Sequence, residues 1–435
     1  MNLIKKNGKN ICFSIIVIAL AVMPILLQAG MVKSTLVLYL AKCMCFAMVA
    51  IGLDLIWGYT GILSLGHGLY FALGAYGMGM YLKLQATGGK ITDFMQVGGL
   101  TELPAIWKMF RYLPNTLIFM LLIPGALAGI LGYFIFKSRV KGVYFSIISQ
   151  ALTWAAYSLF IALSPYTNGN VGITEIKSLF GSIKGPKNEG NLISLFYLTL
   201  VVMILVYALA SFLVTRKFGK LLIAIRDGEN RTYFSGYCVS RYKNVVYILS
   251  AVFAALAGAL FVNLNGSITP TQMTISYSVT MVIWVAIGGR GTLIGAVIGA
   301  FLVNLCEYHL SSGTLVEIWQ YIIGALFVVV ILFFKGGIVG IVTEQIPTFF
   351  HKMQAKRVRK ECVEHAVEQT TNKEIIDKQT IDKQTIDKQT IDKQATDKKT
   401  TNKYTTDERI IDKQTTGKTV KNQKKTLKKE AKCNV

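Results

Sequence analysis

Long apolar runs fill the first 343 residues of this chain of 435 residues, and they constrain its fold more than any other feature. A helix needs ~20 apolar residues to cross ~30 Å of hydrocarbon, where every backbone polar group must find its partner within the protein. Ten runs meet or approach this length: Ile11–Ala29, Thr35–Trp57, Leu63–Leu82, Leu113–Phe136, Gly142–Leu163, Leu192–Val214, Val245–Val262, Met273–Gly288, Thr292–Cys306 and Val316–Phe334. The sequence therefore predicts an all-α polytopic membrane protein with about ten transmembrane helices.

Basic residues gather in one long polar loop, Thr215–Lys243, which carries seven Lys/Arg and only two acids, Asp227 and Glu229. Membrane proteins keep an excess of Lys and Arg in their cytoplasmic loops. With this loop inside, the shorter basic loops also fall on the inner side, and an even number of spans leaves both termini in the cytoplasm. We therefore expect an integral protein of the plasma (cell inner) membrane with a long cytosolic loop at its centre.

Two parts of this topology stay open in the sequence. The eighth and ninth runs are short and are joined by Gly288–Thr292, so residues 273–306 can be two full spans or a re-entrant hairpin. Residues 1–29 combine three lysines with an apolar core, as a cleaved signal peptide does. Their core of ~19 residues is long for a signal peptide, which favours a retained span.

The chain changes character after residue 343, which divides it into a transmembrane domain, 1–343, and a basic low-complexity cytosolic tail, 344–435. The tail repeats Asp-Lys-Gln-Thr with a five-residue period, beginning at Asp377. Such a period places successive isoleucines on different faces of a helix or a strand, so they build no core and the tail is predicted to be disordered. Its net positive charge suits a membrane lipid surface, and we expect no nucleic-acid partner.

Chemistry-bearing residues form no catalytic or metal-binding pattern in the sequence, so we expect this chain not to be an enzyme. Polar residues inside spans are informative instead, because a carboxylate that faces lipid costs ~3 kcal/mol or more and broken helices often line permeation paths. The candidates for a translocation path are Asp54, Trp57, Ser64, His67, Gln150, Trp154 and Asn263. The alternatives are ordinary hydrogen bonds between helices or, around residues 57–68, a simple turn at the cytosolic face.

The middle of the basic loop, Lys220–Arg231, can form a short helix. Leu221, Leu222 and Ile225 share one of its faces, and the remaining positions are mostly charged. A charged helix with a small apolar ridge, displayed to the cytosol, suits docking into the groove of a partner protein. The alternative is a solvated loop that binds nothing.

Several stretches resemble the membrane permeases of branched-chain amino-acid-type ABC importers. The first is Ile51–Tyr76, which reads IGLDLIWGYTGILSLGHGLYFALGAY, and the second is the central loop from Phe218 to Asn230, followed by Ser240–Lys243. Ala255–Leu260 follows in the expected place. Trp284–Ala296, which reads WVAIGGRGTLIGA, is similar to the urea-transport branch of this family. The resemblance covers about residues 35–343 and leaves the tail without a counterpart.

The resemblance implies a division of labour among several subunits. This chain and a second homologous permease subunit form the translocation path. Two cytosolic ATPase subunits bind ATP and contact the central loop, and an extracytoplasmic binding protein delivers the substrate. No cofactor is expected in this subunit. The loop residues expected to couple to the ATPase are Gly219, Ile225, Arg226, Asp227, Glu229, Asn230, Arg231 and Gly236.

The function predicted on this basis is that of a permease subunit in an ATP-driven importer for urea. Branched-chain amino acids are the alternative substrate within the family. A secondary transporter or channel would use the same bundle without an ATPase, and a scaffold would act through its tail. The sequence leaves open whether the two permease subunits are identical.

A topology prediction follows from the charge distribution. We expect the loop Asn168–Gly190 outside and Thr215–Lys243 inside, because the second loop holds seven Lys/Arg. Single cysteines at Ser178 and Ser235, in a background without native cysteines, are to be labelled with an impermeant thiol reagent in intact cells. Labelling of Ser178→Cys alone is expected, and labelling of Ser235→Cys from outside would refute the topology.

Overall fold

In the computed structural model, the described residues are 2–138, 140, 142–176 and 189–310, with isolated positions at 321, 324, 325, 328 and 337. This part of the chain is almost entirely helical, and its only β-type pairing is an isolated antiparallel bridge between Ile173 and Ile268. The expected tail, 344–435, and most of the expected span Val316–Phe334 lie outside the described residues, as does the proposed domain boundary.

Six helices in the described ranges are long and apolar enough to cross a membrane. They are α1 (Asn2–Gln28), α2 (Ser34–Thr60), α6 (Leu113–Lys137), α7 (Gly142–Ala162), α9 (Glu189–Thr215) and α12 (Val239–Asn265). The helices α13 (Ile275–Gly288) and α14 (Leu293–Leu310) pass the same test only together, with a bend of 118° between them. The mainly helical membrane fold is confirmed, whereas the expected number of about ten spans is not.

The helix α3 (His67–Ala86) was expected to begin four residues earlier, at Leu63. Residues 61–66 are instead non-helical, because Gly61 adopts a φ of +78° and ends α2 there. The amide N–H of Gly61 bonds the carbonyl of Trp57 at 3.1 Å, which satisfies one of the free carbonyls at the helix end. The chain therefore enters α3 through an unwound segment that needs other hydrogen-bond partners.

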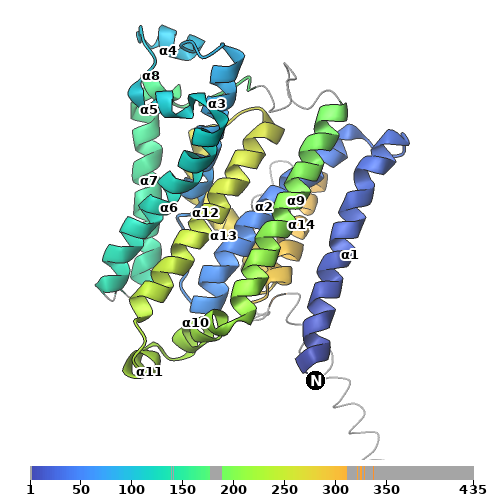
Figure 1. Ribbon diagram of the computed structural model, residues 1–435, viewed down its shortest axis with the longest axis vertical. Helices are drawn as coiled ribbons and strands as arrows, with labels where there is room; N and C mark the ends of the chain where they lie inside the picture. Colours follow the sequence, from blue (N-terminus) through green and yellow to red (C-terminus); the bar gives the residue numbers. More distant parts are fainter. Residues whose placement is uncertain are drawn as a thin grey trace, which may run out of the picture. The chain divides into compact units, whose positions relative to one another are not determined.

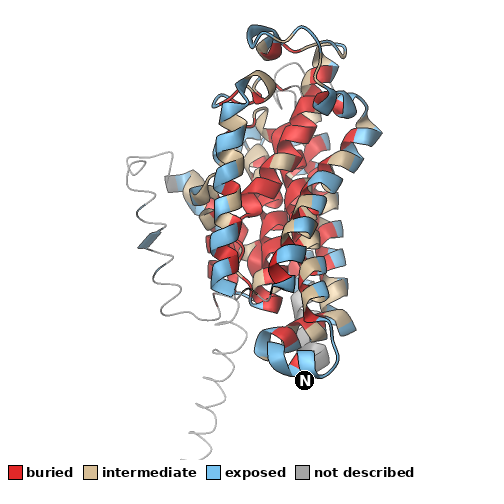
Figure 2. Ribbon diagram, turned by 90° about the vertical axis from the view of Figure 1, so that its left-hand side faces the viewer, coloured by how far each residue is buried: buried red, intermediate tan, exposed pale blue. Residues whose placement is uncertain are grey.

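The centre of the bundle is formed by α2 and α12, which are the most buried of the candidate spans (Figures 1 and 2). α12 packs against α2, α3 and α6. Its contact with α3 is close because both helices present glycines: an added Cβ on Gly258 would meet the carbonyl oxygen of Phe71, and one on Gly74 would meet that of Ala255. Small residues of this kind let helix backbones approach within the membrane.

Short helices occupy the two ends of the bundle (Figure 1). At one end lie α4 (Asp93–Val97), α5 (Ala105–Lys108), the 3₁₀ turn η1 (Met109–Arg111) and α8 (Ser164–Thr167). At the opposite end lie α10 (Lys217–Asp227) and α11 (Glu229–Phe234), between α9 and α12. A second 3₁₀ turn, η3 (Pro270–Met273), precedes α13. The basic loop predicted from the sequence is thus a pair of short helices.

The α3–α12 contact yields a stability prediction. Gly258→Val is expected to destabilise the protein by about 1–3 kcal/mol or more, because its side chain would overlap the α3 backbone at Phe71. Gly142→Val is the control, because the space around the added Cβ at Gly142 is open. Heat-induced unfolding in detergent measures the difference. Equal midpoints for the two variants would show that the helices can separate without loss.

Candidate functional site

The α10–α11 segment, residues 217–234, is the first part of the candidate site. Its first helix begins at Lys217, three residues before the predicted start, and ends at Asp227 before Gly228. Apolar residues recur along it at helical spacing, which gives one apolar and one charged side. The predicted helix, Lys220–Arg231, is therefore present only as far as Asp227, and its last residues belong to α11; the question is which way the apolar side of α10 faces.

The apolar side of α10 faces the bundle and not the surroundings. Leu222 is 1% exposed and Ile225 is 2% exposed, and α10 packs against α2 and α9. Gly219 is buried within the same helix, and an added Cβ there would meet the backbone of Val214. Of the expected docking ridge of Leu221, Leu222 and Ile225, the last two side chains are thus already covered by their own chain, and Leu221 is half-buried.

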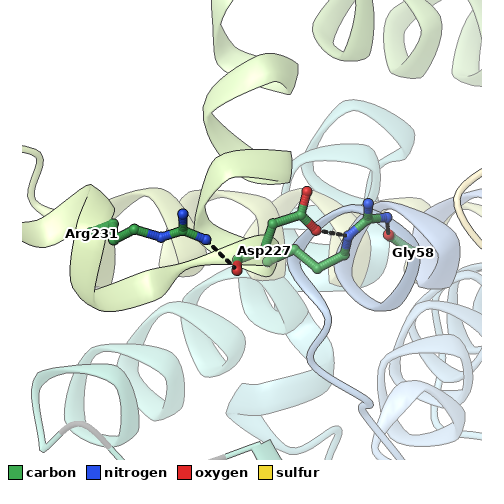
Figure 3. A network of polar contacts seen from close by, with 4 residues as sticks. Gly58, Asp227 and Arg231 are labelled. Carbon is green, nitrogen blue, oxygen red and sulfur yellow. Dashed lines mark hydrogen bonds and ion pairs between the residues drawn. The ribbon is translucent and has the colours of Figure 1, made fainter. Parts of the chain in front are cut away.

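Arg226 ties α10 to the end of α2. Its Nη1 donates a hydrogen bond to the carbonyl oxygen of Gly58 at 2.8 Å, and its Nε donates to Asp227 Oδ1 at 3.0 Å (Figure 3). Arg231 Nη2 donates to the carbonyl oxygen of Asp227 at 3.4 Å, which joins α11 to the same network. The polar side of α10 is thus partly engaged with the bundle, and Asp227 and Arg231 stay exposed.

A second ion pair holds α11 against α12. Lys243, whose side chain is only 9% exposed, donates to Glu229 Oε1 at 2.6 Å. Asn230 beside it is exposed, and Gly236 adopts a φ of +87° in the turn that leads to α12. A cleft of about 470 Å³ lies alongside, lined by Glu229, Asn230, Tyr233 and Phe234 among others. The expected coupling residues thus share one end of the bundle, where Phe234 is 85% exposed.

The second part of the candidate site is the polar junction, which we define as the unwound residues 61–66 with His67, Ser149, Ser250 and Ser278. Ser149 Oγ accepts the N–H of Leu65 at 3.1 Å, and Ser278 Oγ accepts the N–H of Gly68 at 3.3 Å. Side chains from α7 and α13 thereby satisfy backbone groups that would otherwise be unpaired inside the bundle.

His67 joins this junction to the centre of α12. Ser250 Oγ donates to the carbonyl oxygen of Gly52, and His67 Nε2 lies 2.5 Å from Ser250 Oγ. Because the Ser250 proton is engaged, Nε2 is the donor, and in the neutral imidazole Nδ1 then accepts from Ser64 Oγ at 3.1 Å. Ser64 and His67 are both 1% exposed. The side chains that bond one another at the junction are therefore serine hydroxyls and an imidazole.

The other residues predicted for the path lie elsewhere. Gln150 and Trp154 stand on a different face of α7 from Ser149, and Trp154 is 52% exposed. Asn263 lies thirteen residues beyond Ser250 on α12, which is ~20 Å at 1.5 Å per residue, and donates to the carbonyl oxygen of Ala259. These three residues are not brought to the polar junction.

Asp54 and Trp57 lie at the α10 end of α2. Asp54 Oδ1 accepts the N–H of Gly291 at 2.7 Å, and the guanidinium of Arg290 stands over the Trp57 ring, 5.3 Å from its centroid. Both residues predicted for the path therefore contact the turn between α13 and α14. Their prediction as path residues is not tested by this placement, but their partners are now defined.

Several functional candidates were missed in the sequence. Ser146, Ser149 and Thr153 form a buried hydroxyl stripe on α7, and their i, i+3, i+7 spacing was visible. Lys42 was missed because it lies within an otherwise apolar run: it is partly buried on α2 and donates to Asn265 Oδ1 at 2.8 Å. Among the residues that the structure describes, no group of three or more His, Cys, Asp or Glu could hold a metal ion.

Comparison with known proteins relates this chain to membrane-transport permeases. Residues 35–331 match the family model described as branched-chain amino acid transport system / permease component. The high-affinity branched-chain amino acid transport system permease proteins LivM of Salmonella typhimurium and Escherichia coli are each 23% identical to this chain, over 70% of it and 69% of their own length.

A third relative, the ribose import permease protein RbsC of Haemophilus influenzae, is 25% identical over 48% of this chain and 65% of its own length. No solved structure matches the chain. The family model covers more than half of the sequence, including both parts of the candidate site. The chain is therefore an integral membrane protein that belongs to the branched-chain amino acid transport system permease family.

Proposed function

We propose that this chain is the permease subunit of an ATP-driven importer for urea. The observation that carries the proposal is the α10–α11 segment, a charged pair of short helices at one end of the bundle that is bonded to α2 and α12. In this proposal two cytosolic ATPase subunits bind ATP and grip the segment, and a second permease subunit completes the path. An extracytoplasmic binding protein delivers the substrate, and this chain itself changes no covalent bond.

The surface that we propose for ATPase docking is the exposed side of α11. Phe234 is 85% exposed and Tyr233 is 49% exposed, beside the cleft that contains Glu229 and Asn230. Exposed aromatic side chains next to charged groups are typical anchors of protein interfaces. The charged side of α10, with Asp227 and Arg231, supplies the polar rim. This surface replaces the apolar ridge of α10 as the docking element.

Urea as substrate is supported by the chemistry of the polar junction and by the Trp284–Ala296 stretch. The hydrogen-bond partners around residues 61–68 include serine hydroxyls, an imidazole and backbone groups, which are neutral donors and acceptors. Urea is uncharged and offers one acceptor and four N–H donors, so it can exchange hydrogen bonds with such groups without a charged partner. Moving an amino-acid zwitterion past the same groups would leave two charges uncompensated.

Branched-chain amino acids are the second candidate. The LivM relatives are named as branched-chain amino acid permeases, and Lys42 places an ammonium group inside α2. Its hydrogen bond to Asn265 leaves two of its three N–H donors for other acceptors, such as the carboxylate of an amino acid. The Lys42 ammonium group is therefore expected to be needed for uptake of an amino acid and not for uptake of urea.

Uptake of labelled urea and labelled leucine separates the two substrates. In cells that contain the full chain and its partners, we expect ATP-dependent urea uptake that Lys42→Met changes by less than about twofold. If leucine is the substrate, Lys42→Met should lower its uptake by about 10- to 150-fold, because a hydrogen bond to a charged group contributes about 1.5–3 kcal/mol. Lys33→Met, an exposed lysine just before the same helix, is the matched control. Uptake of neither solute in the wild-type chain would refute the proposed function.

Docking through α11 is tested by a pair of substitutions. Phe234→Asp is expected to leave the amount of folded permease unchanged and to weaken co-purification of the ATPase by tenfold or more, because interface anchors contribute about 2 kcal/mol or more. Ile225→Asp is expected to lower the amount of folded permease, because it buries a charge between α10 and the bundle.

Tyr112→Asp provides the control, since Tyr112 is an exposed aromatic residue that immediately precedes α6 at the other end of the bundle. Full ATPase association of Phe234→Asp, together with loss of association in well-folded Ile225→Asp, would return the docking role to α10.

A further inference from the structure

We propose that Asp54, Gly58, Arg226 and Gly291 form a clasp that makes α10, the end of α2 and the α13–α14 turn move as one body. The inference rests on the proposed function, since it assigns the route by which movement of the α10–α11 segment reaches the spans. It gives Asp54 a positioning role in place of direct contact with the transported solute. The clasp joins three elements that are far apart in the sequence.

The clasp consists of two hydrogen bonds on successive turns of α2. Arg226 Nη1 donates to the carbonyl oxygen of Gly58 at 2.8 Å, and the N–H of Gly291 donates to Asp54 Oδ1 at 2.7 Å. Residues 54 and 58 are four apart, so they lie one above the other on the same face of the helix. The last turns of α2 therefore hold α10 through a backbone carbonyl and the α13–α14 turn through a carboxylate.

The buried carboxylate of Asp54 lies next to the N-terminal end of α14, which favours an anion. Asp54 is 0% exposed, and a buried charge needs strong compensation. Gly291 lies two residues before the start of α14, where backbone N–H groups have no partner in the helix and the helix dipole favours an anion. α14 has no acidic residue in its own first turn. Asp54 supplies that anion from α2, which fixes the position of α14 relative to α2.

The absence of a side chain at Gly58 makes the contact possible. A Cβ on Gly58 would lie 2.5 Å from the amide nitrogen of Gly291 and would also meet Asp54 Oδ1. Gly291 itself has a φ of +80°, a conformation that other residues rarely adopt. Two backbones therefore touch directly at this point. The clasp tolerates little relative movement, because no flexible side chain separates the two backbones.

A third contact of different chemistry reinforces the same turn. The guanidinium of Arg290 lies over the ring of Trp57, 5.3 Å from its centroid, a cation–π distance. Trp57 is adjacent to Gly58, and Arg290 is adjacent to Gly291. The turn is therefore held to α2 by an ionic hydrogen bond from Asp54, a backbone contact at Gly58 and a cation–π contact at Trp57.

The helix α13 connects the clasp to the polar junction. Gly288 and Gly299 bring α13 and α14 into backbone contact, since an added Cβ on Gly299 would meet the carbonyl oxygen of Trp284 and the backbone of Gly288. Ser278, on α13, accepts the N–H of Gly68 at the junction. In this proposal, a displacement of α10 is transmitted through these packed elements to the first turn of α3 and the polar junction, and a direct measurement tests the coupling.

Rigidity of the clasp is measured on the purified full chain, independently of transport. Spin labels at Lys220→Cys on α10 and at the exposed native Cys306 on α14, in a background without the other native cysteines, report the distance between the two elements by double electron–electron resonance. We expect a narrow distance distribution that becomes broad in Asp54→Leu, which loses the acceptor, and stays narrower in Asp54→Asn, which keeps an acceptor oxygen. Thr199→Val, which removes a buried hydroxyl from α9, is the control and should leave the distribution narrow.

Transport is then compared with ATP hydrolysis in the assembled importer, with Lys220 and the native cysteines restored. Asp54→Leu is expected to keep ATPase association within about twofold and to lower the solute moved per ATP hydrolysed by about 5- to 150-fold, the usual range of coupling between sites. An unchanged distance distribution in Asp54→Leu, or an unchanged ratio of uptake to hydrolysis, would overturn the clasp. If the wild-type chain moves neither urea nor leucine, the proposed function fails, and the distance measurement still decides whether the clasp is rigid.

Discussion

Hydrocarbon offers no hydrogen-bond partners to a broken helix, and the organisation of this bundle follows from how two such breaks are satisfied. The break at residues 61–66 is bonded by Ser146, which donates to the carbonyl oxygen of Leu63, and by Ser149, which accepts the N–H of Leu65. The break at residues 289–292 is bonded by Asp54. In each case, a side chain from another helix replaces the missing intrahelical partner. These polar side chains therefore stabilise the two breaks in the absence of any solute. A role in transport must leave these hydrogen bonds in place or replace them.

These bonds are also weak enough to be exchanged. A typical protein hydrogen bond contributes only about 0.5–1.5 kcal/mol net, whereas an unpaired buried group costs more than that. A solute that carries its own donors and acceptors can replace the partners of the 61–66 segment one by one, so the junction opens without leaving polar groups unpaired. Under the proposed function, urea has this property, and an aliphatic side chain does not. The closed junction seen around His67 is then the resting arrangement of the same groups.

The sequence predicted the features that depend on composition along the chain. The apolar runs located α2, α6, α7, α9 and α12, and the charged loop contained the short helix α10. The direction in which α10 faces was not predictable, because burial against α2 and docking to a partner favour the same apolar residues, Leu222 and Ile225. The hydrogen-bond partner of Asp54 was not predictable either, since Gly291 is 237 positions away in the chain. No sequence pattern around Asp54 indicates that the N-terminus of another helix packs against it. Sequence reasoning therefore located the polar positions and could not say what they contact.

The hydrogen bond between Asp54 and Gly291 also bears on whether a transporter of this kind is a secondary transporter or an ATP-driven importer. A secondary transporter would need a carboxylate that gains and loses a proton or an ion as the path opens, and Asp54 was the clear acidic candidate within a span. Its Oδ1 instead accepts a backbone N–H just before the start of α14, so this carboxylate bonds two elements to each other. It also lies one turn from the carbonyl bonded by Arg226, at the α10 end of the bundle, and not beside His67. Under the proposed function, a carboxylate in this position helps to link α10 to the α13–α14 turn, which suits a transporter that is driven through α10.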